Sequence, residues 1–227
     1  MTKLKGLIFD LDGTLTLTQP LHYEALHEVF LNDYGIEYTQ KEDQEKYSGQ
    51  GSKYTCERVL KEHGKNPSQE EIEKCSARKK GVYDRILANS AIITVSGIRD
   101  FLKTVKEKGL KLIIATGNRA ENTKIILGRI GILEYFGDKI VSLLDVKNHK
   151  PAPDVFLLAA KKLGLKPEEC MVFEDSLNGV HAAKAGNIPC IALTTETTKE
   201  KLLEAGAIAT IDDYNDKKLI EIINKLV

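Results

Sequence analysis

The sequence has no long apolar run and no excess of either charge. Its first ten residues contain an apolar run of only three residues, Leu7–Phe9, which is too short for the core of a signal peptide. No segment approaches the roughly 20 apolar residues that a membrane-spanning helix needs. Lys and Arg total 33 and Asp and Glu total 33, so the chain lacks the basic footprint of a general nucleic-acid-binding protein. We therefore expect a cytoplasmic protein that binds no membrane and no nucleic acid.

Cysteine is scarce and scattered. The four cysteines form no CxxC pair, which argues against a zinc site or a thioredoxin-type motif; they are Cys56, Cys75, Cys170 and Cys190. We expect buried thiols in a reducing compartment. With 227 residues, 42% of them hydrophobic, the chain is long enough for one or two domains with a sizeable core, and intrinsic disorder is excluded.

What the sequence does contain is a regular alternation of strand and helix patterns after residue 90. The expected strands span residues 110–115, 139–143, 171–173, 189–193 and 208–211, and the expected helices span 97–108, 119–130, 154–163, 177–185 and 216–226. Alternation at this spacing indicates a parallel sheet. A further strand is expected at residues 4–9, where an apolar run meets a polar turn.

The segment between the first strand and this alternation differs in character. From Pro20 to about residue 89 the apolar residues recur at helical spacing, and no strand pattern occurs. The fold class is therefore predicted as α/β: a doubly wound parallel sheet with a Rossmann-like core and an inserted α-helical cap domain. The core would comprise residues 1–15 and 91–227, and the cap residues 16–90.

Polar residues follow four of the expected strands. In doubly wound sheets, ligands bind beyond the carboxyl ends of the strands, so these residues are the candidate site. They are Asp10, Asp12, Thr116, Gly117, Asn118, Lys150, Glu174 and Asp175.

This set is suited to phosphate chemistry that uses a divalent cation. Four carboxylates at one edge require a cation, and ligands that are all oxygen match Mg²⁺; the expected metal-binding residues are Asp10, Asp12, Glu174 and Asp175. Asp10 is a candidate nucleophile that would form an aspartyl-phosphate. Lys150 and the cation would offset the repulsion between that carboxylate and a phosphate, and the Thr116 hydroxyl would donate to a phosphoryl oxygen.

Two further features support a phosphate site. Asp12 is a candidate general acid that protonates the leaving oxygen and later acts as a base. Asn118 and Glu121 have the spacing of a capping box at the start of a helix, and the free amides of a helix start favour an anion.

Four motifs in this order resemble the haloacid dehalogenase superfamily of phosphotransferases, over essentially the whole chain. The motifs are Asp10-Leu11-Asp12-Gly13-Thr14, Thr116-Gly117-Asn118, Lys150-Pro151 and Glu174-Asp175. The helical insert between the first two resembles the subclass with a small α-helical cap.

The resemblance implies roles for individual residues. Asp10 would be the nucleophile and a metal ligand, and Asp12 the general acid/base that also binds metal through its backbone carbonyl. The remaining roles are stabilisation of phosphate by Thr116 and Lys150, phosphate contacts from Gly117 and Asn118, and metal binding by Asp175 and Glu174.

Within the superfamily, the sequence is similar to the β-phosphoglucomutase-like group. His22, Gly49 and Lys79 match this group and would bind the substrate. Ser52, however, stands where true β-phosphoglucomutases carry an arginine that holds the far phosphate. The resemblance therefore favours a phosphatase over a mutase.

The function expected from the sequence is a Mg²⁺-dependent phosphatase that hydrolyses a small phosphorylated metabolite, such as a sugar phosphate, through an aspartyl-phosphate. One alternative is a phosphotransferase of the β-phosphoglucomutase type. A second, of another class, is a non-catalytic phospho-accepting signalling module, and a dehalogenase is a minor fourth hypothesis. We expect a monomer or a weak homodimer.

Overall fold

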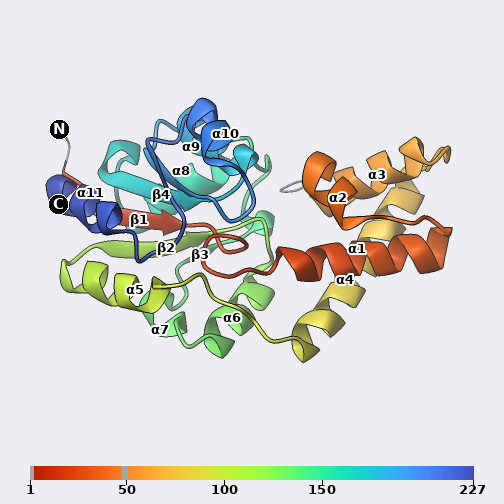
Figure 1. Ribbon diagram of the computed structural model, residues 1–227, viewed down its shortest axis with the longest axis horizontal. Helices are drawn as coiled ribbons and strands as arrows, with labels where there is room; N and C mark the ends of the chain where they lie inside the picture. Colours follow the sequence, from red (N-terminus) through yellow and green to blue (C-terminus); the bar gives the residue numbers. More distant parts are fainter. Residues whose placement is uncertain (1–2, 48–50) are drawn as a thin grey trace. The chain divides into compact units, whose positions relative to one another are not determined.

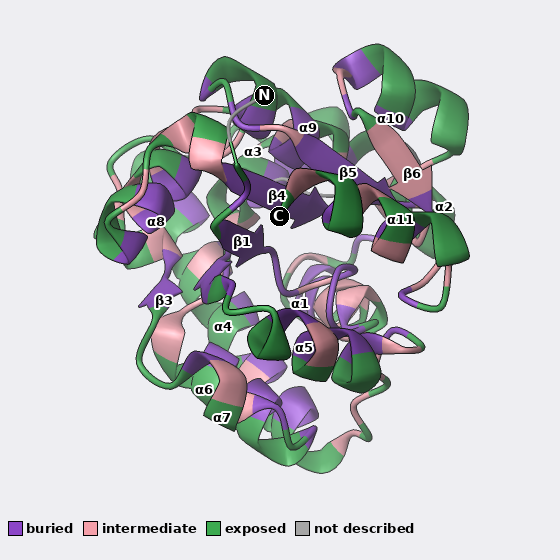
Figure 2. Ribbon diagram, turned by 90° about the vertical axis from the view of Figure 1, so that its left-hand side faces the viewer, coloured by how far each residue is buried: buried purple, intermediate pink, exposed green. Residues whose placement is uncertain are grey.

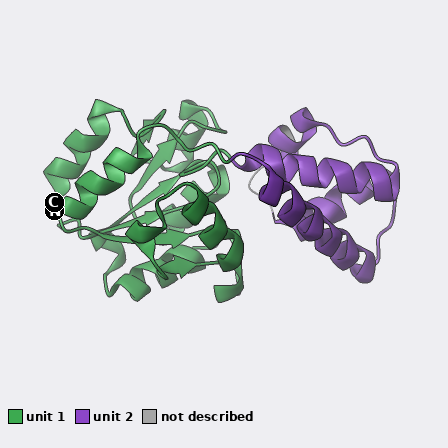
Figure 3. Cartoon of the chain, turned by 90° about the horizontal axis from the view of Figure 1, so that it is seen from below, with its two compact units in different colours: residues 1–17, 92–227 green, residues 18–91 purple. Residues whose placement is uncertain are grey.

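The computed structural model describes residues 3–47 and 51–227. The chain divides into two compact units, shown in Figure 3. Unit 1 comprises residues 1–17 and 92–227, and unit 2 comprises residues 18–91. Each unit has its own packed interior and is described separately.

Unit 1 is built on a parallel sheet of six strands in the order β3-β2-β1-β4-β5-β6. The strands are β1 (Gly6–Phe9), β2 (Lys111–Ala115), β3 (Ile140–Val141), β4 (Cys170–Glu174), β5 (Cys190–Leu193) and β6 (Ala209–Ile211). The chain runs outward from β1 on one side and then on the other, as a doubly wound sheet does. The predicted fold class is confirmed.

Helices cover both faces of this sheet. Figure 1 shows α5, α6 and α7 on one face and α8, α9 and α10 on the other. The helices of unit 1 are α5 (Ile98–Glu107), α6 (Ala120–Arg129), α7 (Leu133–Phe136), α8 (Asp154–Leu163), α9 (Leu177–Ala185), α10 (Lys199–Ala205) and α11 (Lys217–Leu226), with the 3₁₀ turns η2 (Leu143–Asp145) and η3 (Pro167–Glu169). Helices α7 and α10 and the 3₁₀ turns were not predicted from the sequence, since elements this short show little apolar periodicity.

The central strands are buried on both sides, as their near-continuous apolar sequences require. Figure 2 shows β1 and β4 entirely in the buried class. On one face, Phe9 stacks on Phe173 with ring centroids 4.8 Å apart. On the other, Ile8 is level with Ile113 and Val172 on the neighbouring strands and packs under α8 and α9.

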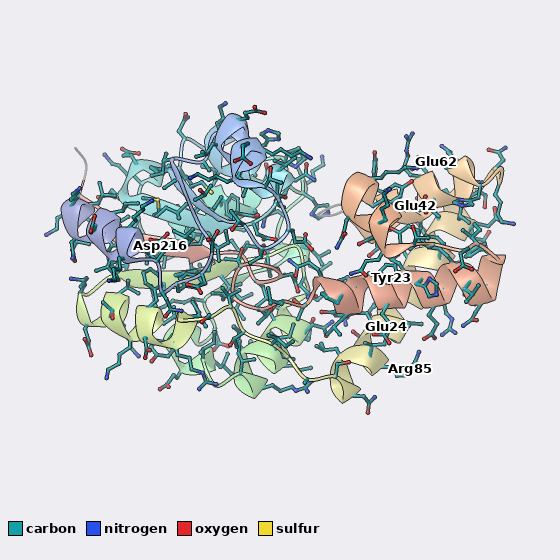
Figure 4. The ribbon with its side chains drawn as sticks, viewed as in Figure 1. Tyr23, Glu24, Glu42, Glu62, Arg85 and Asp216 are labelled. Atoms are coloured by element: carbon teal, nitrogen blue, oxygen red, sulfur yellow. The ribbon has the colours of Figure 1, made fainter. Side chains whose placement is uncertain are left out.

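The described residues of unit 2 form helices joined by loops, without a strand. Its elements are α1 (Gln19–Tyr34), α2 (Gln40–Glu42), the π-helical turn η1 (Asp43–Tyr47), α3 (Ser52–Glu62) and α4 (Gln69–Asn89). The start of α4 is fixed by a capping box in which the side chains of Ser68 and Glu71 each accept a hydrogen bond from the other's backbone amide. At the other end of this helix Arg85, labelled in Figure 4, forms an ion pair with Glu28 of α1.

Helix α11 ends the chain and is capped in a similar way. Asp216, also labelled in Figure 4, accepts a hydrogen bond of 2.9 Å from the backbone amide of Lys218. Among the residues that the structure describes, no helix combines the length and the apolar character that crossing a membrane would take.

The burial of β1 predicts how substitutions in it change the free energy of unfolding. Ile8 is 0% exposed, whereas Ile125 on α6 is 50% exposed. Ile8→Ala should lower the free energy of unfolding by about 2–5 kcal/mol because it opens a cavity between the sheet and its helices. Ile125→Ala, which removes the same atoms, should change it by less than about 0.5 kcal/mol. Urea denaturation followed by circular dichroism measures both, and equal losses would show that the face under α8 and α9 is not the core.

Candidate active site

Asp10 and Glu174 come together because β1 and β4 are neighbouring parallel strands with matched register. Phe9 is level with Phe173, and the backbone amide of Asp10 donates to the Phe173 carbonyl at 3.0 Å. Asp10 therefore leaves β1 beside Glu174, the last residue of β4, and Asp175 follows directly. One carboxylate oxygen from each of these three residues lies within 4.8 Å of the others, and all three side chains are buried.

Lys150 lies between two of these carboxylates. Its ammonium nitrogen Nζ is 2.5 Å from Oδ1 of Asp10 and 2.7 Å from Oε1 of Glu174. Nζ is also 4.8 Å from the centre of the Phe156 ring on α8. A lysine from the loop before α8 thus forms a buried ion triad with residues at the ends of two strands.

Burial in this group shifts the pKa values of its acids. Desolvation raises the pKa of Asp10 to about 7, and the neighbouring Glu174 and Asp12 charges act in the same direction, whereas Lys150 opposes them. The pKa of Asp175 is also raised, first by burial and then by the charges of Glu174 and Asp10. Burial lowers the pKa of Lys150, but the two carboxylates outweigh burial and leave it above its usual value.

The donor set fits a hard divalent cation. Three buried carboxylates lie beside a single ammonium. Burial, with a smaller contribution from the neighbouring acids, raises the pKa values of Asp10 and Asp175. A cation with a preference for oxygen ligands, such as Mg²⁺, would compensate the negative charge of these carboxylates. Asp10, Glu174 and Asp175 are the residues that could hold the ion through their side chains.

A threonine that the sequence analysis did not assign to the site supports one of these acids. The hydroxyl of Thr14 donates to Oδ1 of Asp175 at 3.1 Å, and both residues are buried. Thr14 is the last residue of the first motif, so its place in that motif was the signal available in the sequence.

Asp12 lies close by, but its carboxylate is separate from the three buried acids. In the part of the chain that the structure describes, the acidic group comprises Asp10, Glu174 and Asp175 without Asp12. Oδ2 of Asp12 instead accepts a hydrogen bond of 3.4 Å from the side-chain amide of Asn118. Asp12 is therefore not a member of the buried acidic group, and its role in proton transfer stays a prediction.

The loop after β2 carries the other polar residues. Thr116 is 1% exposed, and its Oγ1 accepts a hydrogen bond of 3.0 Å from the backbone amide of Asn118. Gly117 between them is exposed. The predicted capping box is wrong: Arg119 is the N-cap of α6, and Oδ1 of Asn118 accepts from the Arg119 amide at 2.8 Å instead. Asn118 thus orders the loop rather than the helix.

Two predicted substrate-binding residues lie together in unit 2. Nζ of Lys79 on α4 is 2.8 Å from Nδ1 of His22 on α1, and the His22 ring stacks on Tyr83 with centroids 4.1 Å apart. Lys79 is only 6% exposed. Asp43 has a raised pKa, caused by burial and opposed by its hydrogen bond from Tyr38 and by the His22 and Lys79 charges. The third predicted residue, Gly49, lies outside the described residues.

Comparison with known proteins identifies the family. Residues 4–187 match the haloacid dehalogenase-like hydrolases. The chain belongs to this family. A phosphorylated carbohydrates phosphatase from Thermotoga maritima is 33% identical to the chain over 211 residues, which are 92% of this chain and 94% of the relative.

Solved structures agree with this assignment. A haloacid dehalogenase hydrolase of family IA, variant 3, from Entamoeba histolytica aligns with a TM-score of 0.87 at 28% identity, covering 98% of this chain and 99% of that one. A β-phosphoglucomutase from Clostridium difficile aligns with a TM-score of 0.84 at 26% identity, covering 98% and 97%. The predicted family is confirmed, and the predicted phosphatase and phosphoglucomutase activities are both represented among its relatives.

The buried ion triad makes a prediction for stability. Lys150→Met should lower the free energy of unfolding of the metal-free protein at pH 8 by about 3–5 kcal/mol, because Asp10 and Glu174 then stay buried without their cation. Lys124→Met, which breaks an exposed pair with Asp138, should leave stability unchanged. Urea denaturation in EDTA compares the two, and equal stabilities would show that the ammonium does not compensate these carboxylates.

The raised pKa of Asp10 makes a prediction for pH dependence. Since the folded protein keeps a proton on Asp10 up to a pKa of about 7, against 3.8 for a free aspartate, the folded state binds more protons than the unfolded state between these values. The metal-free wild type should therefore lose stability relative to Asp10→Asn as the pH rises from about 4 to about 7. Denaturation curves of both proteins in EDTA test this, and a relative gain in stability over the same range contradicts it.

Proposed function

We propose that the protein is a Mg²⁺-dependent phosphatase that hydrolyses a small phosphorylated carbohydrate through an aspartyl-phosphate on Asp10. The observation that carries the proposal is the placement of Lys150 between Asp10 and Glu174, with Asp175 in the same buried group. Asp10, Glu174 and Asp175 would hold the ion, which supplies positive charge that draws the substrate phosphate and the Asp10 carboxylate together.

In the first step, a carboxylate oxygen of Asp10 attacks phosphorus and the bond from phosphorus to the ester oxygen breaks. Asp12 gives its proton to the departing oxygen, so the product leaves as an alcohol. Lys150 stabilises the negative charge near Asp10, and the Thr116 hydroxyl donates to a phosphoryl oxygen.

In the second step, Asp12 takes a proton from a water molecule as the water oxygen attacks the phosphorus of the aspartyl-phosphate. The bond from phosphorus to the Asp10 oxygen breaks and inorganic phosphate leaves. Because Asp12 gains the proton that it gave up in the first step, the cycle ends with both carboxyl groups in their starting states.

The substrate class rests on the relatives and on unit 2. A relative of 33% identity over nearly the whole chain is named for phosphorylated carbohydrates. We propose that His22 and Lys79, which contact each other in unit 2, bind the carbohydrate part of the substrate, and that Gly117 and Asn118 contact its phosphate.

The second candidate is a β-phosphoglucomutase, in which a sugar hydroxyl takes the place of water in the second step. The similarity to a β-phosphoglucomutase along 98% of the chain favours it. Ser52, at the start of α3, weighs against it, because a neutral hydroxyl offers much weaker attraction than an arginine to the far phosphate of a bisphosphate.

The proposal predicts that substitution of Asp10 or Asp12 lowers activity, whereas substitution of a surface aspartate does not. With Mg²⁺ and a panel of sugar phosphates, wild type should release phosphate, whereas Asp10→Asn and Asp12→Asn should each lose at least about a hundredfold in kcat/KM. Asp138→Asn, at an exposed side chain, is the matched control and should keep full activity. EDTA should abolish turnover, and added Mg²⁺ should restore it.

Three results would overturn the proposal. Full activity of Asp10→Asn would exclude the covalent route, and unchanged turnover in EDTA would exclude the ion. Formation of glucose 6-phosphate from β-glucose 1-phosphate in a coupled assay, faster than phosphate release, would establish the mutase instead.

A further inference from the structure

Gly179 lies in the first turn of α9, directly against the Glu174 carboxylate. Ser176 caps this helix, and its Oγ accepts a hydrogen bond of 3.1 Å from the Gly179 amide. A Cβ atom placed on Gly179 would lie 1.8 Å from both Cδ and Oε1 of Glu174 and 2.4 Å from Oε2. These distances are far below any van der Waals contact, so no side chain can occupy position 179 while Glu174 stays where it is.

The backbone does not explain this glycine. Gly179 is not among the glycines with positive φ, and within a helix alanine is the more stable residue. Gly128 in α6 shows what an unconstrained helical glycine looks like here, since a Cβ atom there would meet no atom within 4 Å. What Gly179 supplies is therefore space for one neighbouring group, the Glu174 carboxylate.

Four hydrogen bonds hold that carboxylate in its position. Glu174 is 1% exposed. Its Oε2 accepts hydrogen bonds from the Asp175 amide at 2.8 Å, the Ser176 amide at 2.7 Å and the Ser176 hydroxyl at 3.0 Å. Its Oε1 accepts from Lys150 at 2.7 Å. Moving the carboxylate would break four hydrogen bonds to buried or half-buried donors, each costly to leave unmade.

We propose that Gly179 is a positioning residue of the active site. Because Gly179 has no side chain, the Glu174 carboxylate can occupy the space beside it; we call this space the carboxylate seat. Glu174 in turn holds the Lys150 ammonium 2.5 Å from Asp10. A role of Gly179 in catalysis rests on the phosphatase function proposed above, whereas its effect on the stability of the metal-free protein does not. A methyl group at position 179 would displace Glu174 and disorganise the ion triad without touching Asp10.

A double-mutant cycle in the metal-free, full-length protein tests the carboxylate seat. Gly179→Ala should lower Tm by at least about 4 °C, because the methyl group and the carboxylate compete for one space. In a Glu174→Ala background the same change should raise Tm by about 2 °C, since the competitor is gone and only the helix preference for alanine remains. Gly128→Ala, the matched helical control, should raise Tm similarly.

A binding measurement adds a readout that general destabilisation would not move. By titration calorimetry well below Tm, Gly179→Ala should bind Mg²⁺ at least about tenfold more weakly than wild type, as outer partners of metal ligands do when altered. Gly128→Ala should bind Mg²⁺ as wild type does.

The outcomes separate this inference from the proposed function. If Gly179→Ala raises Tm in the wild-type background, or lowers it equally in both backgrounds, the carboxylate seat is overturned. If the sign of the Tm change reverses between backgrounds, the carboxylate seat stands even where no phosphatase activity is found, because the metal-free cycle involves no turnover.

Discussion

The Lys150 ammonium, buried between the carboxylates of Asp10 and Glu174, is the interaction on which the rest of the site depends. A buried carboxylate is costly unless a cation compensates it, and Asp175 adds a third to the group. Burial raises the pKa values of Asp10 and Asp175, and the charges of the neighbouring acids raise them further. The surplus of negative charge that strains the metal-free site makes it a strong site for a divalent cation.

The fold produces this arrangement through register rather than through local sequence. Since β1 and β4 are parallel neighbours with Phe9 level with Phe173, their carboxyl ends place Asp10 beside Glu174 although 164 positions separate them in the sequence. The two residues that precede α9, Asp175 and Ser176, donate their backbone amides to Oε2 of Glu174. Apolar packing on both faces of the sheet fixes the positions of β1 and β4, and these strands fix the positions of Asp10 and Glu174.

The sequence predicted this edge well because the acids mark the ends of two short, buried strands: Asp10 follows β1, Glu174 ends β4 and Asp175 follows it. It also predicted α8 and α9 at their observed limits, where Pro153 and Gly164 flank α8 and Ser176 and Gly186 flank α9. It failed where a tertiary partner decides the outcome. Asn118 bonds to Arg119 and Asp12 instead of forming a capping box. Lys79 lies in a run of charged residues, yet α1 and α4 bury it against His22, and no local pattern specifies that contact.

Protons that the buried acids carry in the metal-free protein can be counted directly, as the number released when Mg²⁺ binds. Titration calorimetry at pH 7 in two buffers of different ionisation enthalpy gives that count without any substrate. With the pKa of Asp10 at about 7 and that of Asp175 raised, we expect a net release of protons on binding, and therefore different heats in the two buffers. Equal heats in both buffers would contradict this expectation.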